Sequence, residues 1–241
     1  GKRSRELALE SYLSSGTPGT VHGMYEIHKK FGKLSWEQLI QPSITLASEG
    51  FRVTNELAEA LKSEQIKLGK STNTKKIFFK NGEPLKKDDL LIQTDLANTL
   101  RLIAIYGSDG FYKGETAQKI ALDMSNNGGL ITTEDLSGYY SKLRDPIIFN
   151  YKNLKIASMP PPSSGGLLLG LMLNMLENFD LSDDPNDVKN ILIISEIMQI
   201  AFSLRAKHIG DEDFYPVPVE NFLSEDIATE LSKNVNTKRT S

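Results

Sequence analysis

The sequence contains no cysteine, and this absence excludes several kinds of site at once. Disulfide scaffolds, thiolate zinc sites and cysteine nucleophiles all require that residue. A large charge of one sign is also missing, because 28 basic and 31 acidic residues give a net charge of −3. Proteins that bind nucleic acid or anionic membranes usually show a clear excess of basic residues. We therefore expect neither nucleic acid nor a membrane surface as a partner.

Long hydrophobic runs are scarce as well. The longest, Leu167–Met175, is interrupted by Gly170 and Asn174, and it is shorter than the roughly 20 apolar residues of a membrane helix. We expect no membrane span. The 241 residues are 39% hydrophobic and show no internal repeat, which favours a single domain over residues 1–241. The first residues, GKRSRELALE, contain neither an initiator methionine nor the apolar core of a signal peptide, so we expect a piece of a longer or processed protein.

Helical spacing of apolar residues dominates what is present. Two capping boxes are predicted, one at Ser35 and one at Thr132, and Thr20, Thr94 and Asp187 are further candidate N-caps. A strongly apolar helix is expected over residues 167–181, and a second long helix over residues 188–209. The runs PIIFNY and LKIAS, separated by a Lys-Asn turn, predict a β-hairpin. The pattern favours an α+β fold that is mostly helical, with a few strands.

The stretch PPPSSGG between the hairpin and the first of those helices is the most unusual in the chain. Prolines lack the N–H groups that a strand ladder needs, so we expect them to hold the chain in an extended, polyproline-like conformation that ends the strand. A serine can then accept a hydrogen bond from the first helical amides, and the glycines allow a sharp turn. We predict a structural role, that of a joint between strand and helix, for seven residues: Pro160, Pro161, Pro162, Ser163, Ser164, Gly165 and Gly166.

Three chemical roles compete with these structural interpretations. A serine nucleophile at Ser163 or Ser164 would need a base, and the only histidines, His22, His28 and His208, occupy helical patterns. The stretch also departs from the G-x-S-x-G motif. A phosphate-binding loop would need a lysine where leucines follow the glycines. The acidic run at residues 211–213 could bind a cation, but it lacks the spacing of a calcium loop, and a solvated loop at the end of the preceding helix is the better interpretation.

Taken in order, four blocks of the sequence closely resemble the large subunit of bacterial γ-glutamyltranspeptidase, from about Ser15 to Leu223. They begin with SGTPGTVHGMYEIHKKFGKLSWEQLIQPSITLASEGF and continue with GEPLKKDDLLIQTDLANTLRLIAIYGSDGFYKGETAQKIALDMSNNGGLITTEDLSGYY, SMPPPSSGGLLLGLMLNMLENFDL and SEIMQIAFSLRAKHIGDEDF. The resemblance implies an N-terminal-nucleophile hydrolase with a four-layer αββα sandwich. Such a protein is made as a precursor that cleaves itself into two subunits.

The resemblance also implies an activity. Family members transfer or hydrolyse the γ-glutamyl group of glutathione and related amides through an acyl-enzyme on a threonine, the first residue of the small subunit. No metal or organic cofactor is needed. The expected partners are a γ-glutamyl substrate such as glutathione and the small subunit of the same precursor. A periplasmic or secreted location is favoured by the resemblance alone.

No catalytic residue is carried over to this chain. The Thr-Thr-His motif that starts the small subunit is absent, and we do not assign the nucleophile to Thr240 or Ser241. The chain also departs from the family at Leu204, where the family usually has an aspartate, and at Glu212, where it usually has a proline. Loss of the aspartate removes a plausible partner for Arg205. A divergent, non-catalytic paralogue or interaction module on the same scaffold is therefore the alternative, and a stand-alone serine hydrolase is a third hypothesis.

Overall fold

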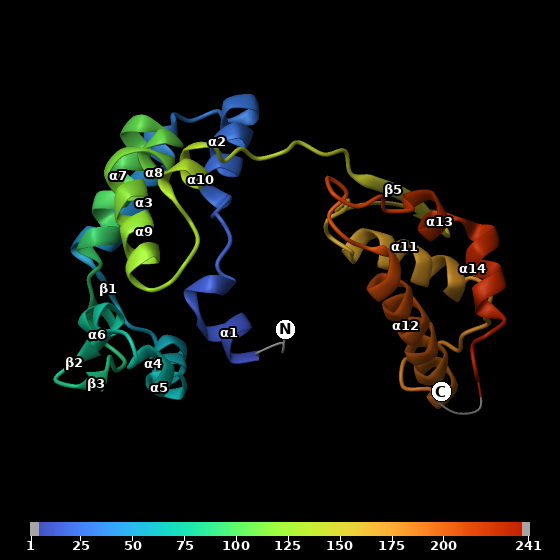
Figure 1. The fold of residues 1–241 in the computed structure, drawn as a ribbon. Coiled ribbons are helices and arrows are strands. Elements are labelled where there is room, and N and C mark those ends of the chain that lie inside the picture. Colours follow the sequence, from blue (N-terminus) through green and yellow to red (C-terminus); the bar gives the residue numbers. More distant parts are fainter. Residues whose placement is uncertain (1–4, 238–241) are drawn as a thin grey trace. The chain divides into compact units, whose positions relative to one another are not determined.

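The structure, a computed structural model, describes residues 5–237. The chain divides into two compact units, Gly1–Lys142 (unit 1) and Leu143–Ser241 (unit 2), which we describe separately (Figure 1). The single domain expected over residues 1–241 stays a prediction.

Unit 1 is mainly helical. Its helices are α1 (Arg5–Glu10), the 3-10 turn η1 (Tyr12–Ser14), α2 (Thr20–Phe31), α3 (Trp36–Glu49), α4 (Asn55–Ser63), α5 (Gln65–Leu68), α6 (Thr72–Phe78), α7 (Thr94–Tyr106), α8 (Asp109–Tyr112), α9 (Gly114–Asn126) and α10 (Thr133–Ser137). Its strands are β1 (Phe51–Arg52), β2 (Phe79–Lys80), β3 (Glu83–Pro84) and β4 (Leu90–Leu91). β1 pairs with β4 and β2 with β3, both antiparallel.

The helix starts follow the capping chemistry in part. The predicted capping boxes are confirmed at Ser35 for α3 and at Thr132 for α10. The predictions at Thr20 and Thr94 are wrong, because each is the first residue of its helix and the preceding residue makes no side-chain cap bond. At α2 the backbone of Gly19 already has helical angles, so the helix begins before the threonine hydroxyl can cap it.

Unit 1 buries its apolar side chains in separate clusters. One lies beneath the small strands, around Val53, Leu61, Leu85 and Leu91. Another joins α8, α9 and α10, with Leu136 fully buried at its centre. Helices α3 and α7 also pack against each other. The unit is thus built from helix pairs, and its two-residue strands pair only over short segments.

Unit 2 places a hairpin on a small group of helices. Its elements are β5 (Ile147–Tyr151), β6 (Leu154–Ser158), α11 (Gly165–Leu176), α12 (Val188–His208), α13 (Val219–Leu223) and α14 (Glu225–Ser232). The predicted hairpin is confirmed, with Ile147 opposite Ser158 and a turn at Lys152 and Asn153. The N-cap predicted at Asp187 is also confirmed, since its side chain accepts from the Lys189 amide.

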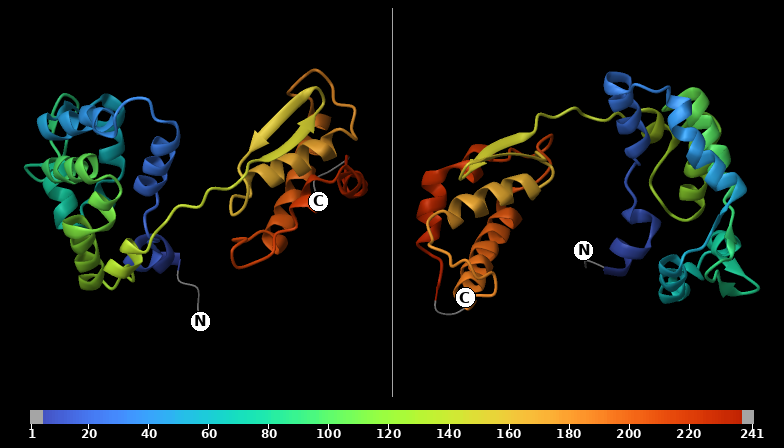
Figure 2. Two further views of the ribbon diagram at one scale, coloured as in Figure 1. Left: turned by 90° about the horizontal axis from the view of Figure 1, so that it is seen from above. Right: turned by 180° about the vertical axis from the view of Figure 1, so that it is seen from behind.

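Helix α11 forms the centre of unit 2. It packs against the hairpin, α12, α13 and α14, as both views of Figure 2 show for the hairpin that lies along it. Leu167, Leu171 and Met175 of α11 are buried, together with Ile193 and Ile197 of α12. The strongly apolar composition of α11 therefore reflects burial on several sides.

The expected fold class is confirmed as α+β and mostly helical. Within residues 5–237 the strands form three separate two-stranded sheets, so this part of the chain does not itself assemble the αββα layers. In the same range, no helix is both long and apolar enough to cross a membrane.

Candidate functional site

The PPPSSGG stretch connects β6 to α11, as expected of a joint, but its prolines are not extended. The Ser163 amide donates to the Pro160 carbonyl at 3.2 Å, which closes a tight turn. Pro161 and Pro162 occupy the middle of this turn, and Pro161 is fully buried. The polyproline-like conformation predicted from the sequence is therefore wrong. The peptide bond between Pro161 and Pro162 is cis, the form in which a proline occupies the third position of a turn.

The two serines of the stretch have different partners. The Ser163 hydroxyl accepts from the Gly165 amide at 3.3 Å, so this serine satisfies the first free amide of α11. Ser164 makes no cap bond. Its hydroxyl instead accepts from the Nε atom of Arg205 on α12 at 2.9 Å. Arg205, which follows Leu204 where the resembled family usually has an aspartate, is thus hydrogen-bonded to the loop.

The histidines form no pair with either serine among the described residues. In unit 1, His22 Nδ1 lies 2.8 Å from Ser141 Oγ and also accepts from the Ser141 amide at 3.2 Å. His28 contacts the Trp36 ring, and its Nε2 lies 2.8 Å from the Leu34 carbonyl oxygen. A serine nucleophile requires a base within hydrogen-bonding reach. The geometry around Ser163 and Ser164 supplies none.

The acidic run of unit 2 is held by one arginine. Arg144, just before β5, contacts the carboxylates of Asp211, Glu212 and Asp213, the last at 3.1 Å. Burial by itself would lower the pKa of Arg144, but the hydrogen bond with Asp213 and the nearby negative charges outweigh it, and the pKa is raised. A guanidinium that several carboxylates share takes the place a cation would occupy. Between residues 5 and 237 no three metal-binding side chains gather into a group that could hold a metal ion.

The two residues that differ from the resembled family, Leu204 and Glu212, each make a defined contact in the structure. Glu212, which stands where that family usually has proline, bonds to Arg144 through its Oε1 atom. Leu204, which stands where it usually has aspartate, packs against the apolar core of unit 2. Each residue therefore has a contact suited to its own chemistry.

Comparison with known proteins assigns the chain. The family model described as gamma-glutamyltranspeptidase matches residues 1–241. The chain belongs to the gamma-glutamyltranspeptidase family. The glutathione hydrolase proenzyme of Escherichia coli (strain K12) is 40% identical to it over 238 residues, which are 98% of this chain and 41% of that protein. The glutathione hydrolase proenzyme of Bacillus subtilis (strain 168) is 41% identical over 222 residues, or 92% of this chain and 38% of that protein.

Solved structures agree with the family. The gamma-glutamyltranspeptidase of Helicobacter pylori superposes with a TM-score of 0.95 at 40% identity, covering 99% of this chain and 69% of that one. The gamma-glutamyltranspeptidase of Pseudomonas nitroreducens complexed with L-DON gives a TM-score of 0.89 at 34% identity, covering 98% of this chain and 70% of that one. These are enzymes of the N-terminal-nucleophile hydrolase fold, so the expected fold type is confirmed. The chain spans 38–41% of the length of the two curated relatives above.

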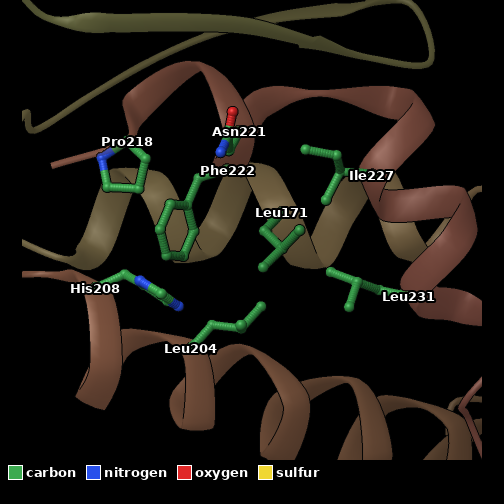
Figure 3. Close-up of a pocket in the computed structure, with 8 residues that line it drawn as sticks. All are labelled: Leu171, Leu204, His208, Pro218, Asn221, Phe222, Ile227 and Leu231. Atoms are coloured by element: carbon green, nitrogen blue, oxygen red, sulfur yellow. The ribbon is translucent and has the colours of Figure 1, made fainter.

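Several groups in this gamma-glutamyltranspeptidase chain were not found by sequence reasoning. Arg144 precedes its acidic partners by more than sixty residues, and Ser141 follows His22 by 119. A pocket between the helices of unit 2, with Leu204 and His208 in its wall, also went unnoticed (Figure 3). No local spacing rule relates residues so far apart, so only the fold brings them together.

Proposed function

We propose that this chain is the scaffold part of a γ-glutamyl transferase and hydrolase that acts on glutathione and related γ-glutamyl amides. The observation that supports this most directly is the family match over residues 1–241, together with 40% identity to a glutathione hydrolase proenzyme. In the proposed reaction, a threonine hydroxyl adds to the γ-carbonyl carbon, and the bond to the amine breaks as that amine takes up a proton. Water or a second amine then accepts the γ-glutamyl group and frees the threonine.

The proposed nucleophile belongs to a separate small subunit rather than to this chain. Thr240 and Ser241 lie outside the described residues, and we do not assign either as the nucleophile. Ser163 and Ser164 are bonded to Gly165 and Arg205, and no histidine is bonded to them among the described residues. This geometry supports a scaffold role for the loop that joins β6 to α11.

Helix α12 supports the existence of a covering partner. One side of the helix packs into the core of unit 2, while a row of apolar side chains on another side stays 40–69% exposed: Val188, Ile191, Ile194, Met198 and Phe202. A helix that is apolar on more than one side is normally buried on more than one side. Since the chain spans 38–41% of its curated relatives, the remainder of the family polypeptide, including the small subunit, is the partner we propose for this row.

The decisive experiment measures release of a chromogenic amine from a γ-glutamyl anilide. We expect activity from the complete matured polypeptide and none from residues 1–241 alone. Ser163→Ala and Ser164→Ala in the complete polypeptide should keep the activity within about fivefold, because a hydrogen bond of this kind is worth only about 1 kcal/mol. Turnover by the isolated chain, or silence of the complete matured protein, would overturn the proposal.

A further inference from the structure

Unit 2 contains a pocket that the proposed γ-glutamyl chemistry does not use. Four helices contribute to its wall, which borders a space of about 180 Å³, and the His208 ring points toward Leu204 and Phe222 (Figure 3). The lining residues are Leu171, Leu204, His208, Pro218, Asn221, Phe222, Ile227 and Leu231. Leu171 and Phe222 are buried, whereas His208 and Asn221 are exposed. The pocket therefore has an apolar floor and a polar mouth.

The lining restricts the charge of any occupant. None of the lining residues is an aspartate, glutamate, lysine or arginine. Moving a charged group into an apolar site without a paired charge costs several kcal/mol. A γ-glutamyl compound carries charged groups and would meet no counter-charge here. The occupant must be uncharged, and its binding is independent of the function proposed above.

The size and the mouth restrict the occupant further. An apolar cavity of about 150 Å³ can admit benzene, so the space here accommodates one aromatic ring or two fused rings. Among residues 5–237, neither the His208 imidazole nor the Asn221 amide group makes a side-chain hydrogen bond within the protein. Both groups can donate and accept. A hydroxyl or ring N–H of a bound molecule would find its partner at His208, whose ring points toward Leu204 and Phe222 in Figure 3.

We infer that this pocket binds small, uncharged aromatic molecules that carry one hydroxyl or N–H group. The ring lies against Leu171, Leu204 and Phe222, and the polar group faces His208. Phenol and indole have the required size and chemistry.

The test titrates phenol and indole into the complete polypeptide, with calorimetry and ligand-observed NMR as readouts. We expect saturable binding of one molecule per chain. Benzoate and benzylamine have a similar ring but a charge, and they should bind at least about tenfold more weakly. Absence of saturable binding, including the case in which another part of the polypeptide fills the pocket, would overturn the inference.

Three variants locate the site. Leu204→Asp keeps the approximate side-chain size but places a carboxylate in the wall, and it should weaken binding at least about tenfold. Ile227→Trp acts from the partly exposed rim, so it should block the pocket without disturbing the buried floor. A matching loss in both variants, with thermal unfolding unchanged in the second, supports the site. Binding that survives both substitutions contradicts it.

His208→Phe separates hydrogen bonding from simple apolar filling. This variant keeps a ring at the mouth and removes its donor and acceptor. Phenol affinity should fall about threefold to tenfold, the value of one hydrogen bond, while toluene affinity stays within about twofold. An equal change for both ligands would mean that His208 contributes only shape, and the hydroxyl or N–H requirement would be wrong.

Discussion

The Nε atom of Arg205 lies 2.9 Å from the Oγ atom of Ser164 and joins the last turns of α12 to the loop that begins α11. The two residues are 41 positions apart in the sequence. The contact ties a loop built around prolines to the longest helix of unit 2. The loop is therefore held at both ends, by the turn at Pro160 and by the arginine.

Removing this hydrogen bond should weaken unit 2 slightly. We expect Ser164→Ala and Arg205→Met each to lower the free energy of unfolding by about 0.5–1.5 kcal/mol, with the lower end favoured because Arg205 is exposed. The double variant should cost little more than either single one, since both remove the same contact. Urea unfolding followed by circular dichroism measures this. Ser203→Ala on the exposed surface of α12 is the matched control, and strictly additive losses would contradict the coupling.

The paired glycines of the loop should respond differently to the same substitution. A Cβ atom at Gly166 would lie 2.4 Å from the Met159 carbonyl oxygen, which is backbone and cannot simply move aside. At Gly165 the nearest atom would be the Ser163 hydroxyl at 3.5 Å, an ordinary contact. We expect Gly166→Ala to destabilise unit 2 by about 1–3 kcal/mol, and Gly165→Ala to stay within about 0.5 kcal/mol of the original. Thermal unfolding of the two variants under the same conditions measures this difference. Equal unfolding temperatures for Gly165→Ala and Gly166→Ala would contradict the prediction.

Local chemistry made part of this fold predictable. The capping boxes at Ser35 and Thr132 each depend on residues three positions apart, and the hairpin depends on two short strands and the turn between them. The residues that form these structures are close together in the sequence, so a local pattern is enough to predict them. Thr20 fits the same cap pattern, but the backbone of Gly19 enters the helix one residue earlier. The preference for threonine at helix starts does not specify at which residue the helix begins.

The features of the candidate site depend on contacts between residues that are far apart in the sequence, and no local pattern predicts such contacts. The PPPSSGG stretch is recognisable, yet the sequence pattern predicts neither its turn at Pro160 nor the hydrogen bond that Ser164 accepts from Arg205 on α12. The sequence pattern of the acidic run at residues 211–213 favours a solvated loop, with a cation site as the alternative, and only the fold brings Arg144 to it. The assigned structural role of the stretch stays a prediction, and the glycine and serine variants test it.

Arg144 should stabilise unit 2 in a salt-dependent manner. Replacing it by glutamine removes the positive charge that contacts the carboxylates of Asp211, Glu212 and Asp213. We expect Arg144→Gln to lower the unfolding temperature, and the difference from the original protein to shrink when salt is raised from about 0.01 M to about 1 M, because screening weakens both the attraction and the repulsion. Lys155→Gln, an equal charge change on exposed β6, should have little effect. A decrease in unfolding temperature that is the same at low and high salt would indicate that the aliphatic part of the arginine side chain stabilises the unit by packing instead.

The capping box of α10 should make unit 1 sensitive to acid. The Asp135 carboxylate accepts from the Thr132 amide at 2.9 Å and from the Thr132 hydroxyl at 2.8 Å. These hydrogen bonds, the backbone one first, lower the pKa of Asp135 in the folded protein. Its contribution is therefore complete above the pKa of an unfolded aspartate, about 3.9, and disappears as the pH falls through the lowered folded pKa.

Asp135→Ala should consequently be less stable than the original protein at pH 7, and the difference should narrow at about pH 3, where the unfolded aspartate is already mostly protonated. The single tryptophan, Trp36, lies in unit 1, so its fluorescence during thermal unfolding follows the relevant unit. Thr132→Val removes the hydroxyl and keeps the backbone amide, and it should reduce the pH-dependent part without abolishing it. The hydrogen bond from the Thr132 backbone amide still favours the ionised carboxylate in Thr132→Val, so some dependence on Asp135 should remain in that variant. Two results would show that the capping box is not the acid-sensitive element. One is a Thr132→Val protein whose stability no longer depends on Asp135, and the other is an Asp135→Ala difference that is the same at both pH values.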